Sequence, residues 1–392
     1  MTDPRFDAVL TFIRAQYPDE DPIPLHVPRF AGRETEYLAE TIRSTFVSYI
    51  GPFVREFEQR FAAYVGARHA IAVVSGTAGL HLALHAVGVR SGDDVLTQPL
   101  TFVATANAIR YLHAHPVFLD IDPDTLGLSP DAVAAYLKAN AIAKADGVYN
   151  RQTGRRIAAC VPVHTFGHPA RIDALVEVCR TYDIPVVEDA AEGLGSLYQG
   201  RHVGTFGHVG VFSFNGNKIV TTGGGGMVVT QDDALAERIR HLSTTAKVPH
   251  PYEYIHDEVG YNYRMPNVNA AIGLAQMEQL PRFLADKRAL AAGYRELATR
   301  IGVGFVDEPP GARSNFWLNA LVWEDEATRT AFLTYAHQQG VLARAAWRLM
   351  SDLPMYRACP TDALTVARDR APRLVNVPSS VRRQSLAQEV AS

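Results

Sequence analysis

Short apolar runs alternate with amphipathic helical stretches between about residues 70 and 230. This alternation is typical of βαβ units, in which helices cover a largely parallel sheet. Helical stretches between the runs include Thr77–Val87, Ala104–Leu112 and Arg171–Tyr182. The seven runs that we expect to form strands are Ala70–Val74, Asp94–Thr97, Val117–Ile121, Ile157–Val163, Pro185–Glu188, Val209–Phe214 and Met227–Thr230. The pattern therefore predicts a large α/β domain around a mostly parallel, seven-stranded sheet.

The pattern changes on both sides of this region. Residues Phe6–Tyr17 have the spacing of an amphipathic helix that ends at Pro18, and an acidic, proline-rich link follows. After residue 260 the pattern becomes mainly helical from Val268 to Ala298 and then mixed. We therefore expect a helical arm over residues 1–22, a large domain over 23–260 and a small C-terminal α+β domain over 261–392.

The composition of the chain favours a small-molecule ligand over nucleic acid. The 392 residues are 47% hydrophobic and 20% charged, with a formal net charge of −3, so the chain has material for a large core but no basic field for nucleic acid. The three cysteines are far apart, so neither a disulfide framework nor a zinc site is expected. The chain shows no signal peptide and no run of 18 apolar residues. We expect a cytoplasmic protein that binds a small molecule, no membrane and no metal.

Lys218 differs from the other lysines of the chain. It directly follows the apolar run Val209–Phe214 and precedes Ile219, Val220 and a turn of four glycines, which places it at a strand end beside an open backbone. Lys138, Lys144, Lys247 and Lys287 lie in polar or helical surroundings that predict exposure to solvent. Taken alone, Lys218 fits a surface loop better than an active site.

A carboxylate pair at another strand end changes this interpretation. The run from Pro185 delivers Glu188 and Asp189 at its carboxyl end, the edge where open α/β sheets bind ligands. Such a carboxylate also fits a helix cap or a metal ligand. Asp189 lies 29 residues before Lys218, one strand away. This arrangement favours pyridoxal 5′-phosphate (PLP), whose ring nitrogen pairs with an aspartate and whose aldehyde binds a lysine.

A third segment could hold the phosphate of such a cofactor. Ser75-Gly-Thr-Ala joins a predicted strand to a predicted helix. Free N–H groups at that helix start, the absent side chain of Gly76 and the hydroxyl of Thr77 form an anion cradle. The segment lacks the P-loop pattern. Ser213, just before the lysine, could add a hydrogen bond or could be an ordinary strand serine.

Seven motifs in fixed order resemble the sugar-nucleotide aminotransferases of the DegT/DnrJ/StrS type, which share the fold of aspartate aminotransferase. The resemblance extends from about Ile23 to at least Leu280. The motifs are Ser75-Gly-Thr-Ala, Thr101-Phe-Val-Ala-Thr, Pro162-Val-His164, Glu188-Asp189-Ala-Ala, Phe212-Ser-Phe-Asn-Gly-Asn-Lys218, Thr222-Gly-Gly-Gly-Gly226 and Gly260-Tyr-Asn-Tyr-Arg264-Met. The resemblance implies the PLP-dependent transferase fold of type I.

The resemblance also implies roles for single residues. Lys218 is similar to the lysine that forms a Schiff base with PLP, and Asp189 to the partner of the ring nitrogen. Phe102 matches an aromatic residue on the cofactor ring. The residues that match cofactor phosphate ligands are Gly76, Thr77, Ala78 and Ser213, together with Asn262, which reaches the site of the other subunit. The resemblance thus implies a homodimer with shared active sites.

Three further positions remain open. Glu192 stands where many relatives have Gln or His near the phenolic oxygen of PLP, and a carboxylate there would repel a phenolate unless it were protonated or turned away. His164 follows an apolar strand; it could line the pocket, which we favour, or be a hydrogen-bonded buried histidine. Arg264 matches an arginine near the substrate, suited to a diphosphate or carboxylate, or it could form an arginine–carboxylate pair on the surface.

The lysine itself favours transamination. Related 3-dehydratases have histidine at that position, so Lys218 indicates an aminotransferase that uses a donor such as L-glutamate. Pro24–Phe30, Thr45–Ser48 and Asn215–Lys218 resemble enzymes that aminate C4 of UDP-4-keto-6-deoxy-N-acetylhexosamines for bacterial surface glycans. A 3-keto sugar or a dTDP sugar is the alternative substrate. A PLP-fold regulator without turnover is the alternative of another class.

Overall fold

A seven-stranded sheet forms the centre of the large domain in the computed structural model, which describes residues 3–387. Its strand order is β3-β2-β6-β7-β10-β11-β1, because isolated parallel bridges Cys160–Val186 and Val163–Asp189 join two hydrogen-bonded blocks. Only β11 runs against the other six strands. The strands are β1 His69–Val73, β2 Asp94–Thr97, β3 His115–Phe118, β6 Ile157–Val161, β7 Val187–Asp189, β10 Val209–Ser213 and β11 Gly226–Thr230. The predicted mostly parallel α/β sheet is confirmed.

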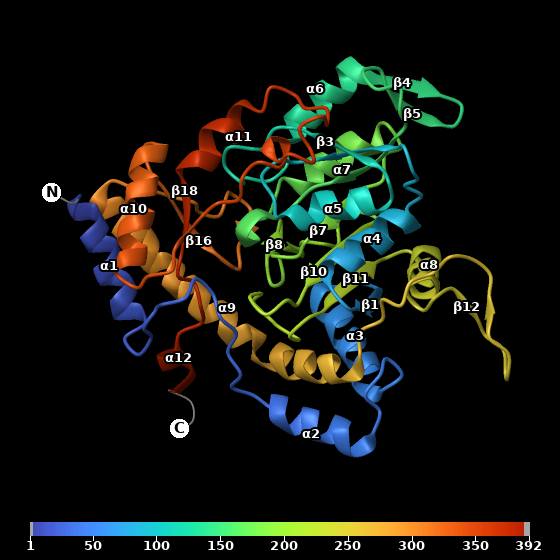
Figure 1. The fold of residues 1–392 in the computed structure, drawn as a ribbon, viewed down its shortest axis with the longest axis horizontal. Coiled ribbons are helices and arrows are strands. Elements are labelled where there is room, and N and C mark those ends of the chain that lie inside the picture. Colours follow the sequence, from blue (N-terminus) through green and yellow to red (C-terminus); the bar gives the residue numbers. More distant parts are fainter. Residues whose placement is uncertain (1–2, 388–392) are drawn as a thin grey trace.

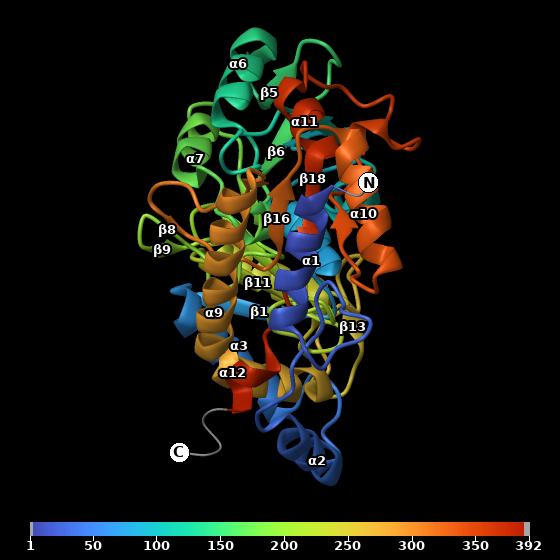
Figure 2. The same cartoon turned by 90° about the vertical axis from the view of Figure 1, so that its left-hand side faces the viewer.

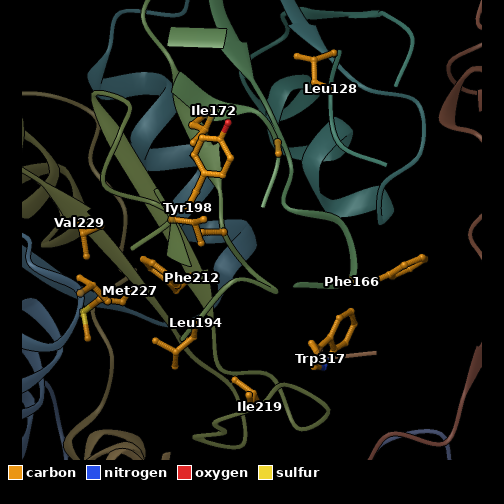
Figure 3. Packing of buried hydrophobic residues seen from close by; sticks show 14 of the residues in the cluster. Leu128, Phe166, Ile172, Leu194, Tyr198, Phe212, Ile219, Met227, Val229 and Trp317 are labelled. Carbon is orange, nitrogen blue, oxygen red and sulfur yellow. The ribbon is translucent and has the colours of Figure 1, made fainter. Parts of the chain in front are cut away.

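Apolar side chains cover both faces of the sheet, and this explains why the sequence of each strand is a continuous apolar run. On β1, Ala70 and Ala72 belong to one core cluster, while Ile71 and Val73 belong to the cluster on the other face. This is the two-residue period of a strand buried on both sides. Phe212 of β10 and Met227 of β11 point into the first cluster (Figure 3). The sheet is therefore held between two apolar clusters, one on each face.

Helices cover the two faces (Figure 1). The predicted helices are observed as α4 Gly76–Ala86, α5 Val103–Tyr111 and α7 Ile172–Arg180. The other helices of this part are α2 Glu34–Ser44, α3 Pro52–Val65, α6 Pro130–Asn140 and α8 Asp233–Ser243. This part also contains short strands outside the central sheet, namely β4 Ala141–Lys144, β5 Gly147–Asn150, β8 Leu197–Tyr198, β9 Arg201–His202, β12 Lys247–Val248 and β13 Ile255–His256.

The C-terminal part packs against a long helix, α9 Asn267–Ile301, which continues through Pro281. Its antiparallel sheet has the order β14-β16-β18-β17. The remaining elements are β14 Gly304–Phe305, β15 Ala312–Arg313, β16 Asn319–Val322, α10 Glu326–Gln338, β17 Arg344–Ala345, α11 Thr365–Arg370, β18 Leu374–Val377 and α12 Arg383–Ala387. Helix α9 packs on α2 and α3 of the large domain and also contacts β14 and β16 of the small one. This single helix therefore connects the two parts of the chain.

The N-terminal helix α1, Pro4–Gln16, lies against α9 and α10 (Figure 2). Its apolar side chains Phe6, Val9, Leu10 and Ile13 enter the core cluster of the small domain. The expected arm is therefore part of that core. Within the described residues, no helix combines the length and apolarity that crossing a membrane requires.

Candidate active site

A pocket of about 310 Å³ lies at the carboxyl edge of the central sheet. The start of α4, the end of β7 and the loop after β10 form one side of it, through Gly76, Asp189 and Lys218. Trp317 and Trp347, from the C-terminal part, also line it. The structure thus brings together three segments that are far apart in the sequence, at the edge where open α/β sheets bind ligands.

The start of α4 is shaped to accept an anion. Ser75 caps the helix, because its hydroxyl accepts the Ala78 N–H at 3.0 Å. The first-turn N–H groups of Gly76 and Thr77 have no acceptor within the helix. A Cβ atom on Gly76 would lie 2.9 Å from the Cβ of Ser213, so this close approach requires glycine. Gly76, Thr77 and Ser213 all line the pocket, as a phosphate site requires.

Asp189 ends β7 at the inner side of the pocket and is 4% exposed. One carboxylate oxygen accepts the Thr105 hydroxyl at 2.7 Å, and the other accepts the Ala191 N–H at 3.1 Å. Burial raises the pKa of Asp189, although both hydrogen bonds act to lower it. A buried carboxylate held in one orientation is suited to a cationic N–H group of a ligand.

Lys218 extends into the pocket from the loop after β10. Its Nζ lies 3.3 Å from Oε1 of Glu192 and 3.8 Å from the centre of the Trp317 ring. Only 12% of its side chain is exposed. The amine is therefore largely shielded by the protein while its residue lines the pocket.

Glu192 is buried beside this amine. Its Oε2 accepts the backbone N–H of Phe166 at 2.8 Å, which leaves Oε1 directed at Lys218. Burial raises the pKa of Glu192, the charge of Lys218 lowers it, and the charge of Asp189 raises it further. The carboxyl group is thus turned toward the lysine.

The pocket fits PLP as a set of donors and acceptors. It combines an anion cradle at Gly76 and Thr77, a buried carboxylate at Asp189 and an amine at Lys218. These groups complement a phosphate, a protonated ring nitrogen and an aldehyde. Phe102 also lines the pocket and is 54% exposed, which leaves its ring accessible to a ligand.

The structure does not bring His164 to the pocket. Its side chain is fully buried, with Nε2 3.0 Å from Oε2 of Glu188 and Nδ1 accepting the Ala170 N–H at 3.1 Å. This contradicts the expected pocket-lining position and matches the alternative of a hydrogen-bonded buried histidine. The physical reason is Glu188, which points away from the pocket and binds the imidazole inside the core.

Three other predicted ligands also lie outside the pocket of their own chain. Arg264 is buried, forms an ion pair with Glu58 at 2.7 Å and donates to the carbonyl of Ala72. The alternative left open by the sequence was an arginine–carboxylate pair on the surface; the structure shows such a pair, but a buried one. Ala78 does not line the pocket, because Ser75 takes its N–H. Asn262 is exposed and does not line it either, so its role toward another subunit stays a prediction.

Sequence reasoning missed both pocket tryptophans and one buried lysine. Lys287 was expected in solvent, and this is wrong, because its side chain is fully buried. The signal was its spacing on α9, where Phe283, Lys287, Leu290 and Tyr294 share one buried stripe. For Trp317 and Trp347 the sequence holds no comparable signal, since they reach the pocket only through tertiary packing.

Comparisons with known proteins give consistent results. The sequence profile of the DegT/DnrJ/EryC1/StrS aminotransferase family matches residues 28–391. The putative pyridoxal phosphate-dependent aminotransferase EpsN of Bacillus subtilis (strain 168) is 40% identical, over 85% of this chain and 83% of its own length. GDP-perosamine synthase of Caulobacter vibrioides is 37% identical over 88% and 90%. The structure of the aminotransferase TlmJ from Streptoalloteichus hindustanus superposes with a TM-score of 0.83, at 30% identity over 94% of this chain and 99% of that one.

Proposed function

Because the chain belongs to the DegT/DnrJ/EryC1/StrS aminotransferase family, we propose that the pocket at Lys218 transfers an amino group to a nucleotide-linked keto sugar. The enzyme is a PLP-dependent aminotransferase. One observation carries the assignment of the site. Lys218, Asp189 and the Gly76–Thr77 cradle converge on one pocket, although the sequence separates them widely.

Each of these groups has a role toward the cofactor. With PLP bound, the α4 N-terminus and Ser213 would hold its phosphate, and Asp189 would keep its ring nitrogen protonated. Bound PLP supplies an electron sink for the charge that develops at the α-carbon of the donor amino acid. The free Nζ of Lys218 accepts the proton that leaves this α-carbon. Glu192 holds this amine in place, because its Oε1 lies 3.3 Å from Nζ of Lys218.

The walls of the pocket suit a sugar ring. Trp347 also lines the pocket and offers apolar surface against which the C–H faces of a deoxy sugar can pack. The motif resemblance supports a UDP-4-keto-6-deoxy-N-acetylhexosamine as acceptor, L-glutamate as donor and a role in bacterial surface-glycan synthesis. A GDP-linked 4-keto-6-deoxyhexose is the second candidate, favoured by the 37% identity to a GDP-perosamine synthase.

A substrate panel tests this function. Purified protein loaded with PLP is incubated with L-glutamate and the UDP-, GDP- or dTDP-linked 4-keto-6-deoxy sugars, or with 3-keto sugars, and the amino-sugar product is measured by mass spectrometry. We expect product from a 4-keto sugar. Product only from 3-keto sugars would contradict the ketone position. No product from any sugar, together with no conversion of glutamate, would favour a regulator over an enzyme.

Replacement of Lys218 tests the site itself. Lys218→Ala is expected to abolish covalent attachment of PLP and lower transamination by several orders of magnitude. Lys138→Met, which changes an exposed lysine on α6, is the control and should behave as the unmodified protein. Turnover retained in Lys218→Ala would show that another residue binds the cofactor.

We also propose a homodimer with shared sites. Several exposed apolar side chains lie after α2 and on the β12–β13 hairpin, including Phe46, Ile50, Tyr252 and Tyr254. Exposed apolar side chains of this number favour a protein interface. Asn262, outside the pocket of its own chain, is then free to act in that of the partner.

A further inference from the structure

The pocket stands next to a second buried lysine that the proposed chemistry does not use. Lys287 Nζ donates to the backbone carbonyls of Trp317 at 3.1 Å and Ser379 at 2.6 Å, and it lies 2.9 Å from Nε2 of His26. Burial lowers the pKa of Lys287 to about 7. A neutral amine has two hydrogens and one lone pair for these three partners, and an ammonium group has three hydrogens for the same three. Its bonding capacity is therefore fully used within the fold.

Trp317 connects this lysine to the pocket. Its carbonyl binds Lys287, while its indole N–H donates to the carbonyl of Asn217 at 2.7 Å. The face of the same ring lies 3.8 Å from Nζ of Lys218. The ring face therefore limits where the amine can lie, and the indole bond fixes the residue directly before Lys218. One side chain thus contacts both the backbone and the amine of the reactive segment.

We propose that Lys287 and Trp317 form a support that positions the Lys218 amine for reaction. Lys287 fixes the backbone of Trp317, and the indole fixes the amine and the preceding carbonyl. A lysine side chain has several rotatable bonds, so an unsupported amine would spend less time in the reactive geometry. The inference rests on the proposed function, which gives Lys218 its role.

The first experiment measures how fast PLP attaches to Lys218 in the full-length protein without donor or sugar. Samples are reduced with borohydride at intervals, and the modified peptide is quantified by mass spectrometry over a range of PLP concentrations. Trp317→Leu is expected to lower the rate at saturating PLP several-fold, because the substitution removes both the ring face against the amine and the indole bond to the preceding carbonyl, and so leaves the amine less well positioned. The half-saturating PLP concentration should stay unchanged, because the phosphate cradle is intact. Trp317→Phe keeps a ring face and should lose less.

The second experiment tests whether Lys287 affects the Lys218 amine through Trp317. Lys287→Met is expected to slow attachment as Trp317→Leu does, and the double variant should be no slower than Trp317→Leu alone. Trp323→Phe, which changes a buried tryptophan of the small-domain core, is the control for general loss of packing and should keep the unmodified rate. Circular dichroism verifies that each variant is folded. If Lys287→Met fails to fold, the three tryptophan variants decide the outcome.

Two results would overturn the support. The first is an unmodified attachment rate in folded Trp317→Leu. The second is a double variant whose effect is the product of the single effects, which would show that Lys287 acts independently of Trp317. Failure of the unmodified protein to attach PLP at Lys218 would contradict the proposed function, and this result is distinct from a defect confined to the variants.

Discussion

At the scale of single residues, the pocket brings three ionisable groups together in buried positions. Asp189 and Glu192 are 4% and 5% exposed, and Lys218 is the one cation that contacts Glu192 among the described residues. Burial raises the pKa of both carboxyl groups. Two buried carboxyl groups, Asp189 and Glu192, face one amine, Lys218. This arrangement favours a ligand that brings positive charge, as a protonated ring nitrogen does. The same crowding weakens the protein without its ligand.

The raised pKa of Glu192 leads to a pH-dependent prediction. An acid whose pKa is higher in the folded than in the unfolded protein binds more protons when folded, so stability falls as pH rises above its ordinary value of 4.5. Glu192→Gln removes this charge and keeps an acceptor for Phe166. We expect a higher melting temperature than in the unmodified protein at neutral pH, both without PLP, and a difference that disappears as pH falls to about 4.5.

Calorimetry of the two proteins over a pH series measures this difference. Glu177→Gln is the matched control, because Glu177 is an exposed glutamate on α7 and its replacement should not reproduce the pH dependence. A Glu192→Gln protein that is less stable at neutral pH would show that the ion pair with Lys218 outweighs the cost of burial.

At the scale of secondary structure, α1 is the element whose role changed most from the expectation. It was expected as an arm, and it supplies core residues of the small domain. Phe6 packs edge-to-face on Trp323, with ring centres 5.3 Å apart, and contacts Phe332 at 5.5 Å. The spacing of Phe6, Val9, Leu10 and Ile13 places one apolar stripe on α9 and α10. The helix is therefore held by burial of apolar surface.

Truncation of one side chain tests this role. Phe6→Ala is expected to lower the free energy of unfolding of the small domain by about 3–5 kcal/mol, as large-to-small core substitutions do. The measurement is denaturant unfolding followed by tryptophan fluorescence. Thr11→Ala, on the exposed face of the same helix, should change it little. An equal effect of both variants would mean that α1 does not pack on the small domain in solution.

The sequence predicted those elements whose pattern is local. The strands from Ala70 to Thr230 were found because a strand buried on both faces is a continuous apolar run, and Asp189 and Lys218 were found because strand ends meet at one edge. The hairpin β12–β13 was missed, since its strands are two residues long and Pro249 and Pro251 lie in the loop between them. Trp317 could not be found, because its contact with Lys218 depends on how the C-terminal part packs on the sheet.

At the scale of the whole molecule, one chain supplies the cradle, the carboxylate and the lysine, but not the predicted phosphate ligand Asn262. This residue lies between Tyr261 and Tyr263, which stack at 5.1 Å and pack on His81 of α4. It is exposed at the surface and does not line the pocket of its own chain. A second copy of the chain would give this asparagine a site, because a twofold interface places the same residue in both pockets.

Complementation distinguishes a shared site from a self-contained one. Lys218→Ala and Asn262→Ala subunits, carrying different affinity tags, are coexpressed, and dimers with both tags are isolated. If Asn262 acts across the interface, each mixed dimer has one site with both residues intact and one with neither. In an unsorted equal mixture half of the dimers are mixed, so about a quarter of all sites should be restored.

The control combines two residues of the same pocket. Lys218→Ala mixed with Asp189→Ala leaves one defect in every site, because both residues line the pocket of their own chain, and no activity should return. Restoration in the Asn262 mixture but not in this control would require a site built from two subunits. Its absence from both, with tagged mixed dimers present, would mean that Asn262 serves its own chain or no site, and the shared-site dimer would have to be abandoned.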